Sequence, residues 1–341
     1  MSEPARRRLV FAVLAAALPL ALLSALSLGS VPLSPLGVIG SAAARAGLGA
    51  PAPLGDVGEV ILWSVRLPRV LIAALVGGGL AVVGASLQSL FRNPLADAGL
   101  LGVGPGAALG AVIAVNLGWA QERFLALPLS ACAGALLALL LIYALAHAGG
   151  RPSLSGLLLT GLAVSAVAAA GTSVLLVATE EFRVRTVLFW LAGGLEGRGF
   201  EHAALAAAFV LPGVAALFLL SRPLDVLSLG EEEAAALSLP VHTMRVVVFG
   251  LCALVAGPVT AVAGSIPFVG LIAPHALRGL VGPLGRHLLP ASFLAGAILV
   301  VVADLAARSF GQYVELPLGS VTAFVGAPYF VLALRGQEGR E

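Results

Sequence analysis

The chain alternates between long apolar runs and short polar stretches from end to end. The apolar runs, most of them near spanning length, cover residues 9–28, 59–90, 96–115, 124–146, 154–177, 203–220, 244–263, 288–307 and 319–334. A membrane-spanning helix needs about 20 predominantly apolar residues. A shorter apolar stretch at residues 264–282 contains two prolines, and a broken element at membrane depth is tolerated only inside protein or along a cavity. The pattern therefore predicts an all-α, polytopic membrane protein with about ten transmembrane helices.

Composition supports this reading and adds a limit on partners. The chain is 60% hydrophobic and 11% charged, with a mean hydropathy of +1.06, whereas soluble domains carry about 25% charged residues. A soluble fold could not bury so much apolar surface, so the bilayer must be its solvent. We expect a single transmembrane domain over residues 1–341, in contact with membrane lipid. The net charge of +2 gives no reason to expect a nucleic-acid partner.

The N-terminus sets the expected orientation. Arg6, Arg7 and Arg8 precede the first apolar run. A signal peptide also starts with basic residues, but its apolar core is only about 7–15 residues long. We therefore expect a retained first helix with its N-terminus in the cytoplasm, as the positive-inside rule favours. Residues 30–58, rich in Pro, Gly and Ala, are then an external segment with a short interfacial helix.

The second and third runs hold the most ordered pattern in the chain. They read RLPRVLIAALVGGGLAVVGASLQSLFRNPLADAGLLGVGPGAALG from Arg66 to Gly110. In the third run Gly102, Gly106 and Gly110 recur every four residues. This spacing places bare backbone along one helix face, which lets a neighbouring helix approach closely. The stretch predicts two membrane helices joined by a polar hinge and built for dense packing.

The same stretch carries a family resemblance. The order RLPR, GxxLQ, NPLAD and LLGVGPGA resembles the permease subunit of ABC importers for iron-siderophores, haem and vitamin B12, and further matches cover nearly the whole chain. The resemblance implies the type II ABC importer permease fold and transport by alternating access in the bacterial inner (cytoplasmic) membrane. It also implies three kinds of protein partner: a second copy of the chain, two ATP-binding cassette ATPase subunits and a periplasmic substrate-binding protein. The homodimer would place the substrate path on its two-fold axis.

The chain contains no lysine, because all of its 19 basic residues other than histidine are arginine. A P-loop requires the lysine of GxxxxGK[ST] to reach the phosphates, so ATP hydrolysis would need a separate chain. The HExxH, GxSxG and CxxC patterns are absent as well. We therefore predict a transport subunit that is not an enzyme, with no catalytic residues, no metal site and no cofactor. Cys132 and Cys252 lie in apolar runs, where cysteine behaves as a small hydrophobic residue.

Three arginines near the expected external ends of spans need an explanation. Arg66 and Arg69 belong to RLPR, and Arg308 ends the pattern ADxxAR. The resemblance implies that they receive acidic residues of the binding protein, and charged rims of this kind steer encounter and set register. The alternatives are contacts with lipid headgroups or pairing with Asp304 or Glu315.

The polar stretch from residue 221 to 241 falls on the cytoplasmic side and is acidic and helix-prone. It resembles the family's coupling element, LxLGexxAxxLG, which implies a short helix–turn–helix seated in a cleft of the ATPase. The matching residues are Leu227, Leu229, Gly230, Glu231, Ala234, Leu237 and Ser238. Ser238 stands where the pattern has glycine, which predicts a turn of a different shape. An ordinary solvated loop is the alternative.

Two further segments match with departures. Residues 264–278 resemble GxIGFxGLIxPHxxR, with Pro267 replacing a glycine. His275 within it is either a ligand-binding imidazole or, as is more common, a packing or helix-end group. In the turn after residue 151, the resemblance implies a cytoplasmic gate formed by Ser153, Leu154 and Ser155.

Three functions follow from these patterns. The first is an ABC importer permease for an iron chelate (siderophore or haem), with cobalamin close behind; the sequence leaves the choice open. The second is an ion-coupled secondary transporter of a small solute, which broken helices also fit. The scarcity of intramembrane Asp, Glu and His and the acidic coupling element argue against it. The third, a membrane enzyme, has only His275 and scattered acids in its favour.

Overall fold

The computed structural model describes residues 2–48, 54–123, 125–147, 154–310 and 315–338. Within those residues the secondary structure is helical and contains no strand. The helices, in chain order, are α1 (Glu3–Ser27), α2 (Pro35–Arg45), α3 (Gly55–Val60), the π-helix η1 (Ile61–Arg66), α4 (Leu67–Phe91), the 3₁₀ turn η2 (Ala98–Leu101), α5 (Val103–Asn116), α6 (Trp119–Glu122), α7 (Ala126–His147), α8 (Leu154–Ala178), α9 (Glu181–Leu191), α10 (Phe200–Leu219), α11 (Ser221–Leu229), α12 (Glu231–Ala236), α13 (Val241–Ala263), α14 (Val269–Val281), α15 (Gly285–Ser309) and α16 (Leu318–Glu338).

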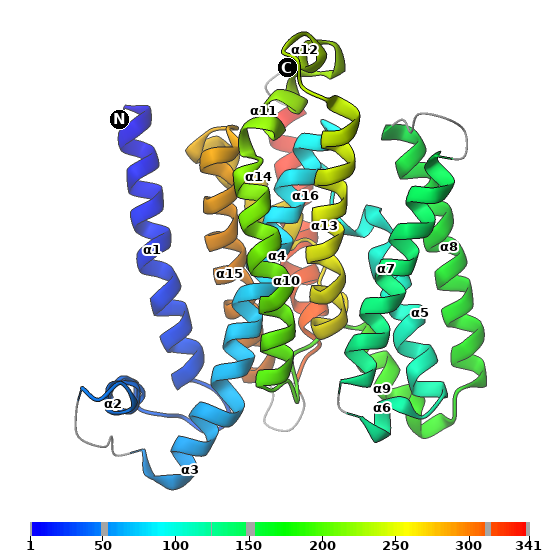
Figure 1. Cartoon of the computed structure of the whole chain (residues 1–341). Helices are drawn as coiled ribbons and strands as arrows, with labels where there is room; N and C mark the ends of the chain where they lie inside the picture. Colours follow the sequence, from blue (N-terminus) through cyan, green and yellow to red (C-terminus); the bar gives the residue numbers. More distant parts are fainter. Residues whose placement is uncertain (1, 49–53, 124, 148–153, 311–314, 339–341) are drawn as a thin grey trace.

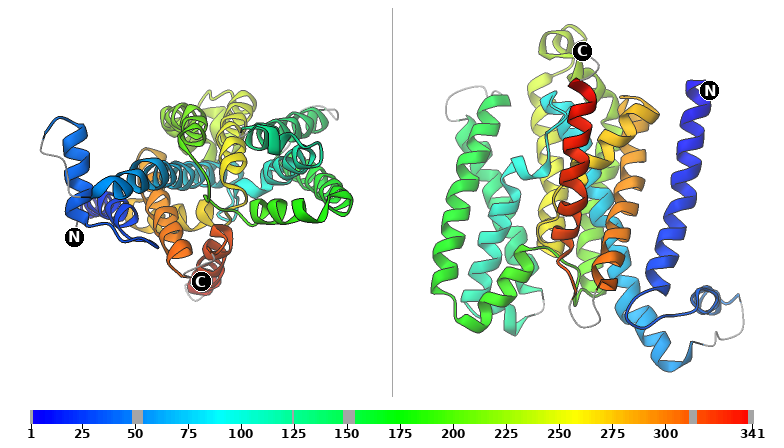
Figure 2. Two further views of the ribbon diagram at one scale, coloured as in Figure 1. Left: turned by 90° about the horizontal axis from the view of Figure 1, so that it is seen from below. Right: turned by 180° about the vertical axis from the view of Figure 1, so that it is seen from behind.

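The helices form an elongated membrane bundle (Figure 1). Among the described residues, seven helices are long and apolar enough to cross a membrane, and α5 and α14 are shorter apolar helices. With α16 these elements match the predicted number of spans. The N-terminus, α11 and α12 lie at one end, which we call the inner end from its arginine content; α2, α3, α6 and α9 lie at the opposite, outer end. Seen from the outer end, α1 and α8 lie at opposite extremes of the bundle (Figure 2).

Helix α4 is the centre of the larger group of helices. It packs against α10, α13, α14 and α15. In the continuous helical stretch Gly55–Phe91 that contains it, 83% of the apolar membrane-spanning part is buried. Glycines make this packing possible. A Cβ atom added at Gly77 would lie 2.1 Å from the carbonyl oxygen of Gly296 in α15, and one at Gly84 would lie 2.0 Å from that of Gly270 in α14. These helices therefore touch backbone to backbone, the closest approach that helices can make.

A second group consists of α5, α7 and α8. Gly106 and Gly110 face α7, since a Cβ at Gly110 would lie 2.2 Å from the Ser130 carbonyl oxygen. The prediction for Gly102 was wrong in one respect, because it precedes α5 with a φ of +67° and is not on the helix face. The third span likewise begins at Val103 and not at residue 96, because Asp97 caps the short turn η2 and Gly102, with its positive φ, separates that turn from α5.

The turn after α12 keeps the shape that glycine normally provides. Ser238 adopts a φ of +59°, and the N–H groups of Ser238 and Leu239 donate to the carbonyls of Ala235 and Ala234 at 2.9 and 3.0 Å. This is the paired hydrogen-bond pattern of a Schellman motif. The predicted change of turn shape was therefore wrong: serine accepts the left-handed conformation, at a cost of about 1–2 kcal/mol relative to glycine.

The predicted break in residues 264–282 is confirmed, but it is shorter than expected. The backbone leaves α13 at Gly264 and re-enters a helix after Phe268, which has a φ of +69°. Pro274 does not add a second break, because α14 continues through it. Cys132 and Cys252 are free and buried, which agrees with their reading as small hydrophobic residues.

We predict that Gly77→Ala lowers the thermal midpoint of the purified protein in detergent. The added methyl group would meet the Gly296 backbone, and overpacking of this kind costs about 1–3 kcal/mol. The matched control is Gly250→Ala in α13, where nothing lies within 4 Å of the added Cβ. That change should hold or raise the midpoint, because alanine favours a helix by about 0.5–1 kcal/mol over glycine. Equal midpoints for the two variants would contradict the packing role of Gly77.

Candidate functional site

The inner end carries the predicted coupling element as two short helices, α11 and α12, joined at Gly230 (Figure 1). Helix α11 lies against α4 and α15, and α12 contacts α11 and α13. Three apolar side chains fix the pair to the bundle: Leu224, Leu227 and Ala234 are 1%, 4% and 0% exposed. Gly230 has a φ of +142°, and a Cβ there would lie 2.1 Å from a Glu233 carboxylate oxygen. The element is thus an ordered helix–turn–helix and not a solvated loop.

A half-buried carboxylate ties this element to α15. The backbone N–H of Gly285, the first residue of α15, donates to Asp225 Oδ1 at 2.6 Å. This N–H is one of the four that a helix leaves unpaired at its start. Burial raises the pKa of the Asp225 carboxyl, opposed by the Gly285 N–H and by the charges of Arg286 and His287. Asp225 therefore caps a transmembrane helix from within the coupling element.

Other residues of the element point outward. Leu229 and Leu237 are 57% and 62% exposed. Glu231, also exposed, forms an ion pair with Arg245 of α13 at 3.0 Å. Large exposed apolar side chains on a polar element outside the spans indicate a contact surface.

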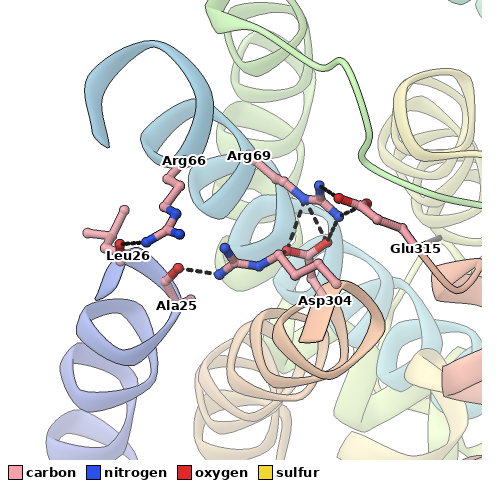
Figure 3. Close-up of polar contacts among 7 residues, drawn as sticks. Ala25, Leu26, Arg66, Arg69, Asp304 and Glu315 are labelled. Atoms are coloured by element: carbon pink, nitrogen blue, oxygen red, sulfur yellow. Dashed lines mark hydrogen bonds and ion pairs between the residues drawn. The ribbon is translucent and has the colours of Figure 1, made fainter. Parts of the chain in front are cut away.

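At the outer end the three singled-out arginines are buried within the protein, and Figure 3 shows Arg66 directed at the end of α1 and Arg69 directed at Asp304 and Glu315. Arg66 is 4% exposed. Its Nη1 donates to the carbonyl oxygens of Leu26 and Ser27 at 2.8 and 2.9 Å, and its Nη2 donates to that of Val31. These carbonyls lie at the end of α1 and just beyond it, where helices leave acceptors unpaired. Arg66 therefore joins the outer end of α1 to the π-helix η1.

Arg69 forms the densest ion cluster in the described chain. Its Nε donates to both carboxylate oxygens of Asp304 at 3.0 and 3.2 Å. Its Nη1 and Nη2 donate to the two oxygens of Glu315 at 3.0 and 2.7 Å. Asp304 is 1% exposed, whereas the Glu315 side chain is 36% exposed. Buried ion pairs cost desolvation energy, and hydrogen bonds such as these are what compensate for it.

Arg308 completes the cluster from α15. Its Nη2 donates to the Ala25 carbonyl, and its Nε lies 3.5 Å from Asp304 Oδ2. The alternative predicted from the sequence, pairing with Asp304 or Glu315, is thus present in this structure. The docking of a binding protein on Arg66, Arg69 and Arg308 stays a prediction, because their guanidinium groups are engaged within the subunit.

A cavity of about 490 Å³ opens beside this cluster at the outer end. It lies between α9, the segment that follows α9 and the start of α16. The charged side chains of its lining are Arg69, Arg185, Glu196, Arg198 and Glu315, and the aromatic ones are Phe182, Phe189 and Trp190.

At Gly193 and Leu318 the cavity borders a junction of three segments held by glycines. A Cβ at Gly193 would lie 2.2 Å from the Ser265 carbonyl oxygen, one at Gly264 would lie 2.1 Å from that of Trp190, and one at Gly319 would lie 2.3 Å from that of Ser265. The Leu318 N–H also donates to the Gly193 carbonyl at 2.8 Å. The end of α9, the break after α13 and the start of α16 therefore meet backbone to backbone.

The predicted cytoplasmic gate falls at the edge of the described chain. Ser153 lies outside the described residues. Leu154 and Ser155 begin α8, but the structure describes only their backbone. The gate therefore stays a prediction. His275 packs edge-on against Tyr329 of α16, with ring centroids 6.3 Å apart, and the described residues contain no group of three or more His, Cys, Asp or Glu that could hold a metal ion.

Two residues that hold helices in place, Asp225 and Gln88, were not expected from the sequence. Gln88 is 3% exposed; its Nε2 donates to the Gly270 carbonyl at 3.0 Å, and its Oε1 accepts from Arg278 Nη2 at 2.8 Å. It therefore links α4 to α14 beside the Gly84–Gly270 contact. A glutamine in an otherwise apolar run is the signal that could have pointed to it, since buried polar groups require partners.

The comparisons with known proteins agree with this architecture. Residues 17–336 match the FecCD transport family. The chain belongs to this family. It is 40% identical over 285 residues to the cobalamin import system permease protein BtuC of Halobacterium salinarum, covering 84% of this chain and 76% of that protein. It is also 40% identical over 278 residues to the Fe(3+)-citrate import system permease protein YfmE of Bacillus subtilis, covering 81% and 82%.

Among solved structures, the fold matches a metal-chelate type ABC transporter in an inward-facing conformation. The TM-score is 0.85 at 31% identity, over 96% of this chain and 99% of the other. These matches confirm the predicted fold class and the predicted family of importer permeases. FecCD proteins are transport components, so the chain is a multi-pass membrane permease.

We predict that Asp304→Asn destabilises the protein by about 3–5 kcal/mol, because it leaves the buried Arg308 without an acid and Arg69 with Glu315 alone. The matched comparison is Glu315→Gln, which removes the half-exposed partner of the same arginine and should cost only about 0–1 kcal/mol. Thermal midpoints of both variants in the same lipid–detergent mixture measure the difference. If Asp304→Asn is no more damaging than Glu315→Gln, the cluster is not a structural centre.

Proposed function

We propose that this chain is the transmembrane permease subunit of an ATP-driven importer in the bacterial inner membrane. Its cargo is an iron chelate or cobalamin, the cargoes named for the relatives. It works with a second copy of itself, two ATPase chains and a periplasmic binding protein, and moves cargo by alternating access. The observation that carries the proposal is the helix pair α11–α12, anchored to α4 and α15 on one side and presenting Leu229 and Leu237 on the other.

The energy source follows from the composition. The chain has no lysine and so cannot form a P-loop. Nucleotide hydrolysis must then come from another chain, and a rigid helix pair at the inner end is a suitable contact for it. A movement imposed on α11 passes directly to α15, because Asp225 caps the first turn of that helix. A flexible loop could not transmit such a movement.

The outer end is suited to receive a binding protein. Arg66, Arg69 and Arg308 hold the outer ends of α1, η1, α4 and α15 together, so they maintain the shape of this face. For Arg69 to contact an acidic partner, the partner must compete with the exposed Glu315 carboxylate. Arg69 and Glu315 also line the cavity at this end. Docking on Arg69 would therefore alter the wall of that cavity.

Uptake by the assembled importer tests the function directly. Proteoliposomes that contain the permease and the ATPase encoded beside it should accumulate the cargo of the neighbouring binding protein. Accumulation should require ATP and be blocked by vanadate. Uptake against a gradient by the permease alone would contradict the proposal.

We predict that Leu229→Asp together with Leu237→Asp abolishes co-purification of the ATPase, because burying two carboxylates in an apolar contact is costly. The permease itself should keep its thermal midpoint, since both side chains are exposed. The control is Leu48→Asp at the outer end, where the leucine is 81% exposed. An intact complex in the double variant would remove the coupling role of α11–α12.

A second prediction concerns docking. Glu315→Gln should raise the affinity for the binding protein by about threefold, because it frees two N–H groups of Arg69 for an acidic partner. Glu122→Gln, an equal change of charge on the exposed helix α6 at the outer end, serves as the control. Surface plasmon resonance on the reconstituted permease measures both. A gain shared by the two variants would indicate general electrostatics, and no gain for Glu315→Gln would count against docking on Arg69.

A further inference from the structure

The outer cavity has an excess of positive charge that the subunit does not neutralise. Of its charged lining residues, Arg69 and Glu315 neutralise each other at 2.7 Å. Arg185 and Arg198 then stand against a single acid, Glu196. Among the described residues, no carboxylate lies within salt-bridge distance of either arginine.

The contacts of these two arginines are with neutral groups. The guanidinium carbon of Arg185 lies 5.5 Å from the centroid of the Phe189 ring. Arg198 Nη1 lies 3.3 Å from His202 Nε2, and Arg198 Nε is buried without a hydrogen-bond partner among the described residues. Burial lowers the pKa of the Arg198 guanidinium, which still leaves it charged at neutral pH. A partly buried, unpaired cation is costly unless a ligand supplies the counter-charge.

The remaining lining offers apolar faces. Three aromatic residues of α9 line the cavity. Phe182 and Phe189 are 70% and 43% exposed, whereas Trp190 is 6% exposed. The volume of about 490 Å³ falls within the range of roughly 300–1,000 Å³ that small-molecule sites occupy. Guanidinium groups bind carboxylates with two parallel hydrogen bonds, which suits an oxygen-rich anion.

We propose that the outer cavity binds an anionic, carboxylate-bearing metal chelate, with Arg185 and Arg198 holding its carboxylates and Phe182 and Phe189 covering its apolar faces. The inference rests on the proposed function, since the cavity would be the first station of the cargo after it leaves the binding protein. It also separates the candidate cargoes, because a corrinoid is larger and carries no free carboxylate cluster. The chelate class is then that of iron(III) citrate, the cargo named for the Bacillus subtilis relative.

The cavity contains its own optical probe. The chain has three tryptophans, and Trp190 lines the cavity. In a Trp63→Phe/Trp119→Phe background, Trp190 is the remaining tryptophan. The full-length permease in lipid nanodiscs is titrated with gallium(III) citrate, a colourless and redox-inert analogue of iron(III) citrate. The expected result is a saturable change in Trp190 fluorescence, with excess cyanocobalamin unable to compete.

Three variants isolate the arginine. Arg198→Gln should raise the Kd about tenfold, which corresponds to about 1.4 kcal/mol, and Arg198→Lys should raise it less. Arg123→Gln makes the same change of charge on an exposed outer residue away from the cavity and should leave the Kd within about twofold. Elution volume and thermal midpoint verify that each variant is folded.

Several results would overturn the proposal. They are the absence of a saturable signal in the parent protein, an unchanged Kd in Arg198→Gln, an equal loss in Arg123→Gln, and effective competition by cyanocobalamin. The titration contains no ATP, no ATPase and no uptake step. Binding without ATP-driven uptake would therefore contradict the proposed function alone, and uptake without binding in this cavity would contradict only the present inference.

Discussion

The direct backbone contact between α4 and its neighbours is the constraint on which the rest of the structure depends. At Gly77 and Gly296 the two backbones meet directly, and the Phe293 side chain of α15 packs against Gly78 beside them. Apolar side chains gain little from leaving lipid for protein, so close packing and hydrogen bonds must hold membrane helices together. The glycines of α4 provide the packing, and Gln88 adds a satisfied polar contact to α14. Helices α10, α13, α14 and α15 pack directly against this centre, and α13 joins it to the group of α5, α7 and α8.

Helix α15 connects the inner and outer ends of the molecule. Its first residue is capped by Asp225 of the coupling element, and Asp304 and Arg308 near its last turn belong to the outer ion cluster. Between these points it lies against α4 over the glycine contact. A helix that is fixed at both ends and packed along its length moves as one body. The inner helix pair and the outer charged face are therefore joined by a single rigid element.

Much of this arrangement could be predicted from the sequence, because the bilayer imposes a simple pattern. The spans followed from their length and apolar content, and the helix pair α11–α12 and the family followed from ordered motifs. The sequence could not show the direction in which a side chain points. Arg66 and Arg69 read as external cations, yet they face carbonyls and carboxylates that lie far away in the chain. Gly102 read as a helix position, yet it has a left-handed conformation just before the helix. Ser238 departed from the family pattern, yet the Schellman hydrogen bonds kept the turn. For the arginines a tertiary contact decided the outcome, whereas at Ser238 local backbone hydrogen bonds did.

The junction of Gly193, Gly264 and Gly319 has a mechanical consequence for the outer cavity. Three chain segments meet there through carbonyl contacts that leave no room for a methyl group, so none of them can slide without displacing the other two. These three segments are α9, the unwound link after α13 and the first turn of α16, and they must move together. The unwound link leads into α14, and Gly319 lies in the first turn of α16. A change that widens the outer cavity must therefore rotate α14 and α16 as well, and these helices carry the movement toward the inner end.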